Sequence, residues 1–424
     1  MKHIVFMMKN YYPYYSAVGI CLGNIADAMV MNNKVTIICE KTEINEEDTE
    51  IYNNQRIIRI VSRPTAFRKK MQAGIKSSNF LKKFCYKSLL FTFRCLEYAK
   101  FILLKNSVQY DLANSFLRAL EGIKDPIDVI VPSCMPFETM VAAIKYKGQH
   151  KDVEVTPFLF DKFAENGTLH RTEWNKKIKM KNNLALEKIT FDACERIIHT
   201  PSWDDHLRKN FSCFSEKFRP VEHPLIKKID ENDLVNYDQS RTNIVYAGTV
   251  LLKSRNPDPT IKIFNEIINQ HPDVQLHFYA MGNATDKIED FERRHQDCVV
   301  FHGQVTTDIA HSAMVNSTML LSIGNVDITQ TPSKIFEYIS CCKPIIHIAV
   351  YTADPVLNIL KSYPLACCVC LESDTFEDQL KKVENFITQG KETEITFSSL
   401  EKIYSNAIPE YSAGLILNSF NGMV

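Results

Sequence analysis

The segment TPSKIFEY (331–338) carries polar side chains at a spacing that suits a phosphate and a neighbouring hydroxyl group. Thr331 can cap a helix that has proline in its first position, and the backbone N–H groups near Ser333 and Lys334 would then face an anion. Lys334 adds a positive charge, and Glu337, one turn on, can accept hydrogen bonds from hydroxyl groups such as those of a ribose. The alternative is a surface ion pair between Lys334 and Glu337, which would contribute about 0.2–0.5 kcal/mol.

A second anion site is indicated by the segment YAGTVLLKSRNPDP (246–259). Gly248 and Thr249 come just past a strand pattern, and Lys253 and Arg255 lie in the loop before a helix pattern. Arginine offers a planar fork of donors and lysine a compact charge, so the loop suits a diphosphate. The alternative is a solvated basic loop.

Two carboxylates in the N-terminal half are candidates for a general base or another catalytic group. Asp161, in FLFDKFAEN, follows a strand pattern, and Glu138 follows the turn VPSCMP. A carboxylate so placed can accept a proton from a reacting hydroxyl group. The alternative is a helix cap or an ion-pair partner.

Strand and helix patterns alternate along the chain in a way that would bring these segments together. A first series of strands is followed by a proline-bearing, charged linker at 218–241 and then by a second series. Two doubly wound α/β domains with parallel sheets are therefore expected, with a ligand in the cleft between them, because such sheets bind ligands at the carboxyl ends of their strands. The predicted strands are 2–8, 34–39, 127–133, 155–160 and 196–202, then 242–248, 274–282, 299–305, 318–324 and 343–350.

The first turn between a strand and a helix holds only Gly19 before the helix, and it lacks the G-x-G-x-x-G fingerprint. This weakens a nicotinamide dehydrogenase interpretation, which needs close backbone approach to a pyrophosphate. Gly19 still permits one close approach to a ligand. The alternative is that it eases a tight turn.

Three segments together resemble glycosyltransferases of the GT-B fold, close to family 4 (glycosyltransferase group 1). They are PSKIFEYISCCKPII (332–346), NIVYAGTVLLKSRNP (243–257) and YYPYYSAVGICLGNIADAMVMNNKVTIIC (11–39). The resemblance is strong over 242–348 and loose over 40–130. It implies an acceptor-binding domain at 1–225, a nucleotide-sugar-binding domain at 226–405, and a C-terminal helix at 406–424 that returns to the first domain.

The resemblance also implies roles for single residues. Glu337 would hold the ribose of a nucleotide-sugar donor, with Lys334 near its phosphates and sugar. Gly248, Lys253 and Arg255 would form the phosphate loop, with Thr249, Thr331 and Ser333 beside the donor. Gly19 would approach the phosphates from the other domain, and Asp161 matches an aspartate that many members carry.

The sequence departs from the family pattern at three places. Retaining members often have a glutamate where this chain has Thr329, and paired N-terminal glycines are reduced to Val18 and Gly19. The usual glycine before the lysine–proline pair is Cys342, which must accept whatever backbone angle ends the helix. The stereochemistry of transfer is therefore left open.

The expected activity is transfer of a sugar from a nucleoside-diphosphate sugar to a glycan or lipid-linked glycan acceptor, in surface polysaccharide biosynthesis. No cofactor and no metal are expected, because cationic side chains and a helix N-terminus can neutralise the leaving diphosphate. Two alternatives remain open: a nucleotide-sugar 2-epimerase on the same fold, and a catalytically degenerate nucleotide-sugar-binding protein. The sequence does not identify the base, sugar, acceptor or oligomeric state.

Charge and hydropathy bear on partners and location. Lys+Arg and Asp+Glu number 50 each, so no overall field would gather nucleic acid, and no apolar run reaches the length of roughly 18 residues for a membrane span. A cytoplasmic protein is expected. Within 63–105, however, eleven basic residues face one acid, a local net of 11 − 1 = +10. This tract predicts a peripheral contact with an anionic membrane on its inner face; the alternative is a helix packed on the N-terminal sheet with its basic side in water.

Overall fold

The computed structural model of the protein describes six stretches of the chain and divides it into two compact units. The N-terminal unit is Met1–Pro224 with Pro409–Val424, and the C-terminal unit is Leu225–Ile408. Each unit is described by itself. The described residues are 1–43, 46–167, 169–229, 234–328, 332–389 and 395–417.

The N-terminal unit is built on a six-stranded sheet in the order β3-β4-β2-β1-β5-β6, in which every pair except β3 with β4 is parallel. Every residue of β1 is buried, as a parallel sheet covered on both faces requires. The bounds are β1 His3–Met7, β2 Lys34–Glu40, β3 Thr49–Tyr52, β4 Gln55–Ile60, β5 Val129–Pro132 and β6 Glu154–Val155.

A smaller parallel sheet continues the N-terminal unit beyond β5. It contains β7 (Phe158–Leu159), β8 (Ile197–His199) and β9 (Phe218–Pro220), and a bridge from Ser133 to Phe158 joins it to the end of β5. The predicted strand at 155–160 is thus split into β6 and β7. Proline 157 has no N–H to donate to a ladder, which accounts for the break between them.

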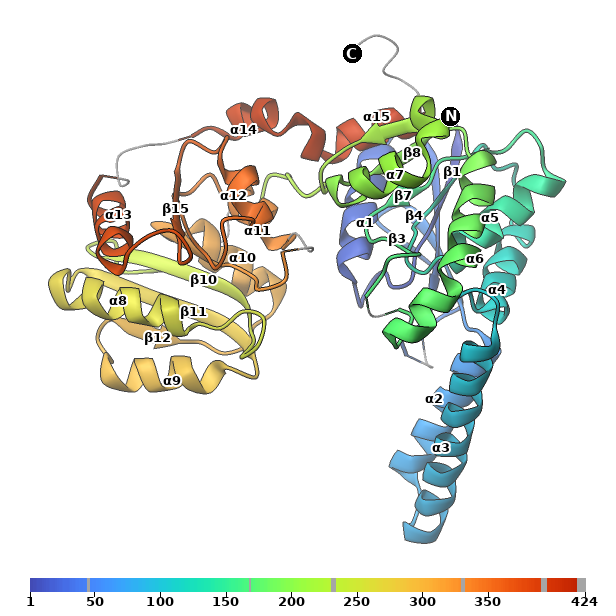
Figure 1. The fold of residues 1–424 in the computed structure, drawn as a ribbon, viewed down its shortest axis with the longest axis horizontal. Helices are drawn as coiled ribbons and strands as arrows, with labels where there is room; N and C mark the ends of the chain where they lie inside the picture. Colours follow the sequence, from blue (N-terminus) through green and yellow to red (C-terminus); the bar gives the residue numbers. More distant parts are fainter. Residues whose placement is uncertain (44–45, 168, 230–233, 329–331, 390–394, 418–424) are drawn as a thin grey trace. The chain divides into compact units, whose positions relative to one another are not determined.

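Helices cover both faces of the N-terminal sheet, and the chain's last helix returns to it (Figure 1). The C-terminal helix α15 packs on α1, and Arg196 Nη2 donates to the carbonyl of Ile416 at 3.0 Å. These contacts place α15 in the N-terminal unit. The helices are α1 Ala17–Met29, α4 Tyr110–Glu121, α5 Glu138–Gln149, α6 Glu173–Asp192, α7 Asp204–Asn210 and α15 Pro409–Leu417.

Two further helices, α2 (Arg63–Ser77) and α3 (Phe80–Leu103), form an antiparallel hairpin that projects from the rest of the N-terminal unit (Figure 1). Their main packing is against each other. The alternative of a single helix lying on the sheet is therefore wrong. A turn at Ser78 and Asn79 separates the helices, and the long apolar face of α3 exceeds what α2 can cover.

The C-terminal unit is a six-stranded, wholly parallel sheet in the order β12-β11-β10-β13-β14-β15. The chain moves outward from β10 to one side and then returns to build the other side from β13. The strands are β10 Thr242–Val250, β11 Val274–Gly282, β12 Val299–Phe301, β13 Met319–Ile323, β14 Ile345–Ala349 and β15 Ala366–Cys370. Such a reversal of strand order is where open α/β sheets bind ligands.

Helices lie on both faces of this second sheet as well (Figure 1). They are α8 Asp258–Gln270, α9 Thr285–Arg294, α10 Thr307–Val315, α11 Lys334–Ser340, α12 Pro355–Leu360, α13 Phe376–Gln389 and α14 Phe397–Ile403. The core joins the buried faces of β10, β11 and β13 to α8 and α9. The two doubly wound, Rossmann-like parallel sheets confirm the predicted fold class.

Candidate functional site

The site with the clearest chemistry lies on α11, which follows β13. Glu337 Oε2 is 2.6 Å from Lys334 Nζ and 3.2 Å from His311 Nε2. All three side chains keep part of their surface exposed. Burial tends to raise the pKa of Glu337, but the contacts with His311 and Lys334 outweigh it and hold the pKa below its ordinary value. A carboxylate ionised at neutral pH is therefore held next to two cationic or hydrogen-bonding partners.

This arrangement contains the ion pair that was the alternative interpretation of the sequence. Both partners contact the same oxygen, Oε2. A partly exposed i, i+3 pair of this kind is worth only a few tenths of a kcal/mol, about 0.2–0.5. Because the pair is so weak, a phosphate could take Lys334 from it, and a hydroxyl group could donate to Glu337, at little cost.

The start of α11 differs from the prediction. The helix begins at Lys334 with Ser333 as its N-cap, and the Ser333 side chain makes no capping hydrogen bond. The amides of Ile335 and Phe336 donate to the carbonyls of Pro332 and Ser333, each at 3.2 Å, in a tighter turn. The predicted cap, Thr331, lies outside the described residues. Lys334 is therefore the stronger candidate for holding an anion.

The phosphate-loop candidates lie where β10 ends. Gly248 and Thr249 are inside the strand rather than past it, because β10 stays paired with β11 as far as Val250 and Gly282. The chain then turns tightly: the amides and carbonyls of Leu251 and Arg255 exchange two hydrogen bonds of 2.9 Å. Lys253, at the turn, is exposed.

Arg255 is only partly exposed and lies beside Tyr246. Burial raises the pKa of the Tyr246 phenol to about 12, with the Arg255 guanidinium opposing the rise. The Tyr246 hydroxyl donates to the carbonyl of Thr249 at 2.8 Å, which fixes the end of the strand. The buried Arg255 Nε has no hydrogen-bond partner among the described residues. One donor of this side chain is therefore unsatisfied.

Helix α11 is joined to β10 through Tyr338, and the segment after β13 is joined to the turn after β10. The amide of Ala247 donates to the Tyr338 hydroxyl at 2.8 Å, and the carbonyl of Ala247 lies 3.1 Å from it. Beyond β13, the amide of Val326 donates to the carbonyl of Ser254 at 2.8 Å. The described residues of the two predicted anion sites, 246–259 and 332–338, thus lie at the same reversal point between β10 and β13.

In the N-terminal unit, Gly19 lies in the first turn of α1. Its amide donates to the Ser16 hydroxyl at 3.1 Å, and a Cβ at this position would come within 2.2 Å of the Asn10 carbonyl oxygen. The close approach that requires glycine here is made by the chain's own loop. This favours the turn interpretation of Gly19, and its contact with a ligand stays a prediction.

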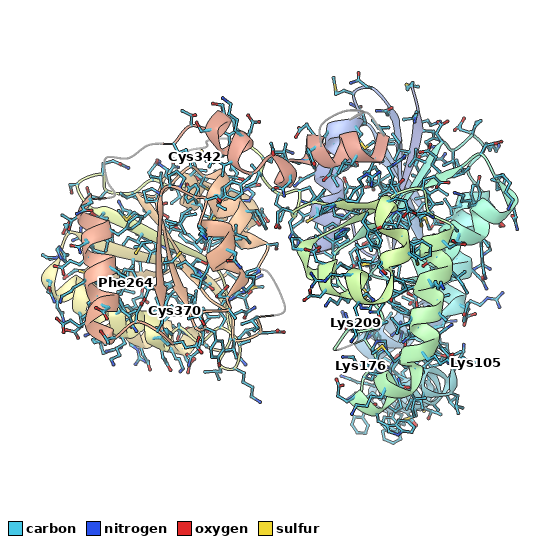
Figure 2. All side chains as sticks on the ribbon, turned by 45° about the horizontal axis from the view of Figure 1, so that its top comes forward. Lys105, Lys176, Lys209, Phe264, Cys342 and Cys370 are labelled. Atoms are coloured by element: carbon cyan, nitrogen blue, oxygen red, sulfur yellow. The ribbon has the colours of Figure 1, made fainter. Side chains whose placement is uncertain are left out.

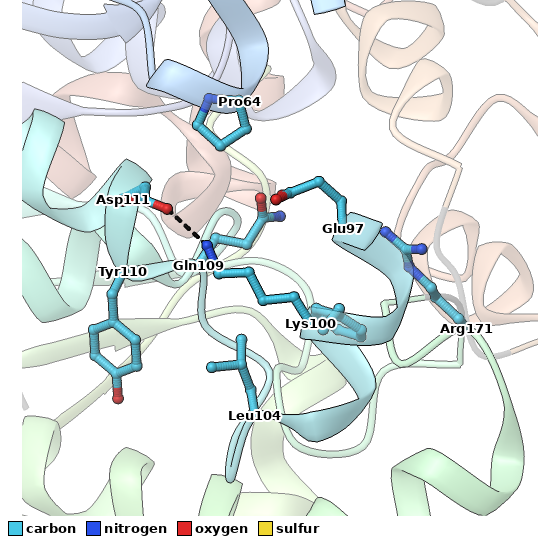
Figure 3. Close-up of a pocket in the computed structure, with 9 residues that line it drawn as sticks. Pro64, Glu97, Lys100, Leu104, Gln109, Tyr110, Asp111 and Arg171 are labelled. Atoms are coloured by element: carbon cyan, nitrogen blue, oxygen red, sulfur yellow. Dashed lines mark hydrogen bonds and ion pairs between the residues drawn. The ribbon is translucent and has the colours of Figure 1, made fainter. Parts of the chain in front are cut away.

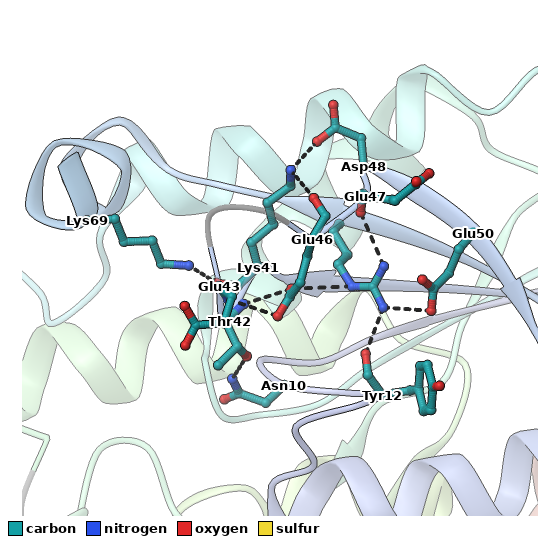
Figure 4. Close-up of polar contacts among 11 residues, drawn as sticks. Asn10, Tyr12, Lys41, Thr42, Glu43, Glu46, Glu47, Asp48, Glu50 and Lys69 are labelled. Atoms are coloured by element: carbon teal, nitrogen blue, oxygen red, sulfur yellow. Dashed lines mark hydrogen bonds and ion pairs between the residues drawn. The ribbon is translucent and has the colours of Figure 1, made fainter. Parts of the chain in front are cut away.

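That loop is pinned from the other side by Arg59, of which 5% is exposed. Arg59 Nη2 donates to the carbonyl of Tyr12 and to Glu50 Oε1, each at 2.8 Å, and Nε lies 3.4 Å from Glu46 (Figure 4). The contacts cross from β4 to β3 and to the loops that follow β1 and β2. They hold the carboxyl edge of the N-terminal sheet in one arrangement.

The two catalytic candidates occupy different environments. Glu138 has 6% of its surface exposed and accepts a hydrogen bond of 2.6 Å from the amide of Gln109. Burial raises its pKa to about 7. Because Glu138 opens α5 and its oxygen holds the start of α4, the contact favours the alternative role at a helix terminus.

Asp161 follows β7 and is exposed. Although its side chain reaches solvent, the protein around it takes water away from the carboxylate, and this desolvation raises its pKa, with His223 opposing the rise. His223 follows β9, and the Ser202 hydroxyl, which follows β8, donates to the carbonyl of Phe160 at 2.9 Å. The carboxyl edge of the small sheet therefore gathers Asp161 and His223. Of the two candidates, Asp161 has the more accessible position.

Three residues of these sites carried little or no signal in the sequence. His311 lies on α10, 26 residues before Glu337. Tyr338 was part of the motif, but its hydrogen bonds to β10 depend on the strand order. Arg59 stands in an ordinary alternating strand. Only the tertiary arrangement brings these three side chains to their partners.

One hollow of about 240 Å³ lies elsewhere, at the base of the hairpin (Figure 3). Lys100 in its wall pairs with Asp111 at 3.0 Å. The predicted site residues are absent from its lining, which consists of Pro64, Glu97, Lys100, Phe101, Leu104, Gln109, Tyr110, Asp111 and Arg171.

Membrane-spanning helices and metal-binding clusters are both absent from the described stretches. Their helices include none that is both long and apolar enough to cross a bilayer. Their histidine, cysteine and carboxylate side chains form no cluster that could hold a metal ion.

Comparison with known proteins gives no match at the level of sequence, because no family model and no curated protein matches the chain. Solved structures do match. A sucrose-phosphate synthase from Thermosynechococcus elongatus is 13% identical, with a TM-score of 0.53 and coverage of 99% of this chain and 95% of the other. That structure is one of a group of GT-B glycosyltransferases. This chain has the GT-B fold.

Two further GT-B structures are similar along their whole length. The lipopolysaccharide outer core galactosyltransferase WaaB is 10% identical, with a TM-score of 0.52, covering 99% of this chain and 100% of the other. A TarM variant from S. aureus, in complex with fondaparinux, alpha-GlcNAc-glycerol and UDP, is 12% identical, with a TM-score of 0.54 and 100% of both chains covered. At such identities the likeness establishes the fold alone.

Proposed function

We propose that this GT-B protein transfers a sugar from a nucleoside-diphosphate sugar to a hydroxyl group of a glycan or lipid-linked glycan. The observation that carries the proposal is the weak Lys334–Glu337 pair on α11, a helix that Tyr338 joins to Ala247 of β10 at the strand reversal of the C-terminal sheet. We further propose that the reaction belongs to surface polysaccharide assembly, in the cytoplasm at the inner face of the membrane.

In this proposal the C-terminal unit binds the donor. Glu337 accepts hydrogen bonds from the ribose, and Lys334, released from its ion pair, contacts the diphosphate. Arg255 supplies its unsatisfied Nε–H together with its charge, and Lys253 adds a second cation from the turn. Negative charge grows on the diphosphate as the sugar leaves, so fixed cations lower the barrier without a metal ion.

The chemistry at the acceptor is assigned to the N-terminal unit. Asp161 is the candidate for receiving the proton of the acceptor hydroxyl, because it is an exposed carboxylate just after β7. Two of the similar proteins support a glycan acceptor: one is named for lipopolysaccharide outer core, and the other is bound to UDP and a sugar-glycerol.

The experiment is a thermal-shift panel of nucleoside diphosphates and nucleotide sugars, because a ligand that binds only the native state stabilises it by mass action. At a ligand concentration of about 100 times Kd the gain is about 2.7 kcal/mol. We expect one base to raise the melting temperature clearly above the others. If no nucleotide at millimolar concentration does so, the proposal fails.

Assays with the nucleotide sugar found in this way then distinguish the three hypotheses: transferase, epimerase and binding protein. A transferase releases the nucleoside diphosphate faster when an acceptor glycan is added. An epimerase isomerises the sugar with donor alone, and a degenerate binding protein binds without turnover under either condition.

A further inference from the structure

The outer face of the α2–α3 hairpin is apolar and exposed. On α3 the exposed fractions are 85% for Phe80, 68% for Phe84, 70% for Phe91, 64% for Leu96 and 83% for Leu103. Burying a side chain of this size is worth about 1.5–3 kcal/mol, so leaving several in water is costly. An apolar face of this extent marks an interaction surface.

Helices α2 and α3 pack against each other without using these exposed side chains. The inward face of α3 is already used: the rings of Phe67 and Phe93 lie 4.5 Å apart, and Leu90 is buried. Gly74 of α2 has no side chain where the Tyr86 ring passes, since a Cβ there would lie 2.8 Å from it. The hairpin is thus complete as a pair of helices, and the opposite side of α3 is still apolar.

Basic residues edge this apolar face on both sides. At about 100° per residue, Phe80, Phe84, Phe91 and the other exposed apolar side chains cover about half the circumference of α3. Lys87 and Arg94 fall beyond one edge, and Lys82 beyond the other. All three cations are exposed. An apolar band between rows of cations is the pattern of a helix that lies in the surface of an anionic bilayer.

The base of the hairpin is fixed, so the tip is presented in a defined direction. Arg171 lies over the rings of Tyr98 and Phe101, 5.0 Å from each centroid, and Lys179 Nζ lies 4.3 Å from the centroid of Phe101. The side-chain Nδ2 of Asn182, on α6, donates to the carbonyl of Lys105 at 2.8 Å. Figure 2 labels Lys105 in this region, together with Lys176 of α6.

The hairpin begins at the carboxyl edge of the N-terminal sheet, where the loops that follow β1 and β2 also lie. Helix α2 begins directly after β4, and Lys69 donates to the carbonyl of Lys41, in the loop that follows β2 (Figure 4). The same loop is joined to Asn10 by a hydrogen bond of 3.0 Å between Asn10 Nδ2 and Thr42 Oγ1. A surface bound by the hairpin would therefore lie near the carboxyl edge of the N-terminal sheet.

We propose that the α2–α3 hairpin docks the protein on an anionic lipid surface, with the apolar band of α3 at the level of the acyl chains and the cations against phosphate headgroups. A second copy of the chain is a poorer occupant, because two hairpins carrying +10 each over 63–105 would repel. The docking itself does not depend on the proposed function. The further consequence, that the enzyme meets a lipid-linked acceptor there, does rest on it.

The test is co-sedimentation of the full chain with vesicles of phosphatidylglycerol and phosphatidylcholine, against vesicles of phosphatidylcholine alone. We expect binding to the anionic vesicles only, and release as salt is raised, since each cation near the surface contributes electrostatically and salt screens it. Equal binding to both vesicles, or to neither, would overturn the proposal.

Matched variants locate the surface. Lys82, Lys83 and Lys87 changed together to glutamate should weaken partition at least a hundredfold, since each lysine contributes about 1 kcal/mol. The control changes Lys124, Lys151 and Lys209 to glutamate, which alters the net charge equally on other exposed parts of the N-terminal unit. Equal loss in both triple variants would mean that only net charge matters, and would contradict docking by the hairpin.

The apolar band has its own pair of variants. Phe84→Ser with Phe91→Ser should also release the protein from anionic vesicles, whereas Met31→Ser with Ile51→Ser, at exposed apolar positions elsewhere, should not. Nucleotide binding should be unchanged in every variant, so a failure of docking is distinguishable from a failure of the proposed function. If the phenylalanine pair instead converts a dimer to a monomer while vesicle binding persists, a second copy is the occupant and the proposal is wrong.

Discussion

The carboxyl edges of the two sheets use their special residues in opposite ways. In the C-terminal unit, Lys334 and Glu337 are paired weakly and partly exposed, and Arg255 keeps an unsatisfied donor. In the N-terminal unit, Gly19 is packed on its own loop and Glu138 is buried against the start of α4. At one edge the charged side chains are weakly paired and partly exposed, whereas at the other edge Gly19 and Glu138 make internal contacts.

This difference indicates which kind of sequence motif is free to bind a ligand. A charged residue in a short, weak pair can change partners, because the pair it leaves is worth little. A buried residue that satisfies a backbone group cannot, because removing it leaves an unpaired polar group at a cost of about 1–3 kcal/mol. The accessible chemistry of the N-terminal unit lies instead at Asp161 and on the hairpin.

The largest expected effect is a loss of turnover on changing Lys334 in the C-terminal unit. Lys334→Ala should lower kcat by about 100- to 1000-fold, because a fixed cation stabilises the leaving diphosphate most in the transition state. Nucleotide affinity should change much less. The measurement is sugar release from the donor identified by thermal shift, with Lys361→Ala, an exposed lysine of the same unit, as the control. A loss of nucleotide affinity with kcat unchanged would make Lys334 a binding residue only.

Alanine substitutions of Gly19 and Gly248 should have different effects on stability and on nucleotide binding. Gly19→Ala should destabilise the protein by about 1–3 kcal/mol, the range for an overpacked site, because its Cβ meets a backbone oxygen. The Cβ of Gly248→Ala would meet the Tyr246 side chain, whose hydroxyl is nearest at 3.2 Å, so this change should cost less stability while weakening nucleotide binding. Denaturant unfolding and nucleotide titration of both variants test this. The reverse pattern, in which Gly19→Ala alone loses the nucleotide, would return Gly19 to the donor site.

A smaller effect is expected where α11 ends. Cys342 adopts φ +57°, the left-handed conformation in which a glycine is usual. Cys342→Gly should stabilise the protein by roughly 0.5–1 kcal/mol, the relief of about 1–2 kcal/mol of strain less the entropy that glycine loses. Cys341→Gly, at φ −73° and buried, is the control and should destabilise. A Cys342→Gly protein with an unchanged denaturation midpoint would mean that the angle is unstrained.

The smallest effect is a change in pH dependence. The pKa of Glu337 is held below its ordinary value of 4.5, because the contacts with His311 and Lys334 outweigh burial. Folding therefore gains from the ionised form above that value, and the gain is lost as the pH falls through the lower, folded-state pKa. Between pH 5 and pH 3, the melting temperature of the wild type should fall more steeply than that of Glu337→Gln. Parallel curves would contradict the pKa shift.

The sequence predicted those parts of the molecule that depend on local pattern. Alternating strand and helix periods predicted both sheets, and the Lys334–Glu337 spacing predicted the ion pair that the structure contains, while the donor site there stays a prediction. It could not predict His311 next to Glu337, since that contact arises from the order in which strands and crossover helices are arranged. Nor did the basic tract at 63–105 reveal its turn at Ser78, because serine and asparagine there interrupt the helical pattern only briefly.

The central claim is that the edge formed by β10 and α11 binds the nucleotide part of a donor. Calorimetric titration of the preferred nucleoside diphosphate into Glu337→Gln tests it most directly, with Glu289→Gln, an exposed glutamate of the same unit, as the control. We predict that Glu337→Gln weakens binding by about 1.5–3 kcal/mol, the value of hydrogen bonds to a charged group, with Glu289→Gln unchanged. Equal affinity in Glu337→Gln and the wild type would contradict the claim and leave Glu337 in a surface ion pair.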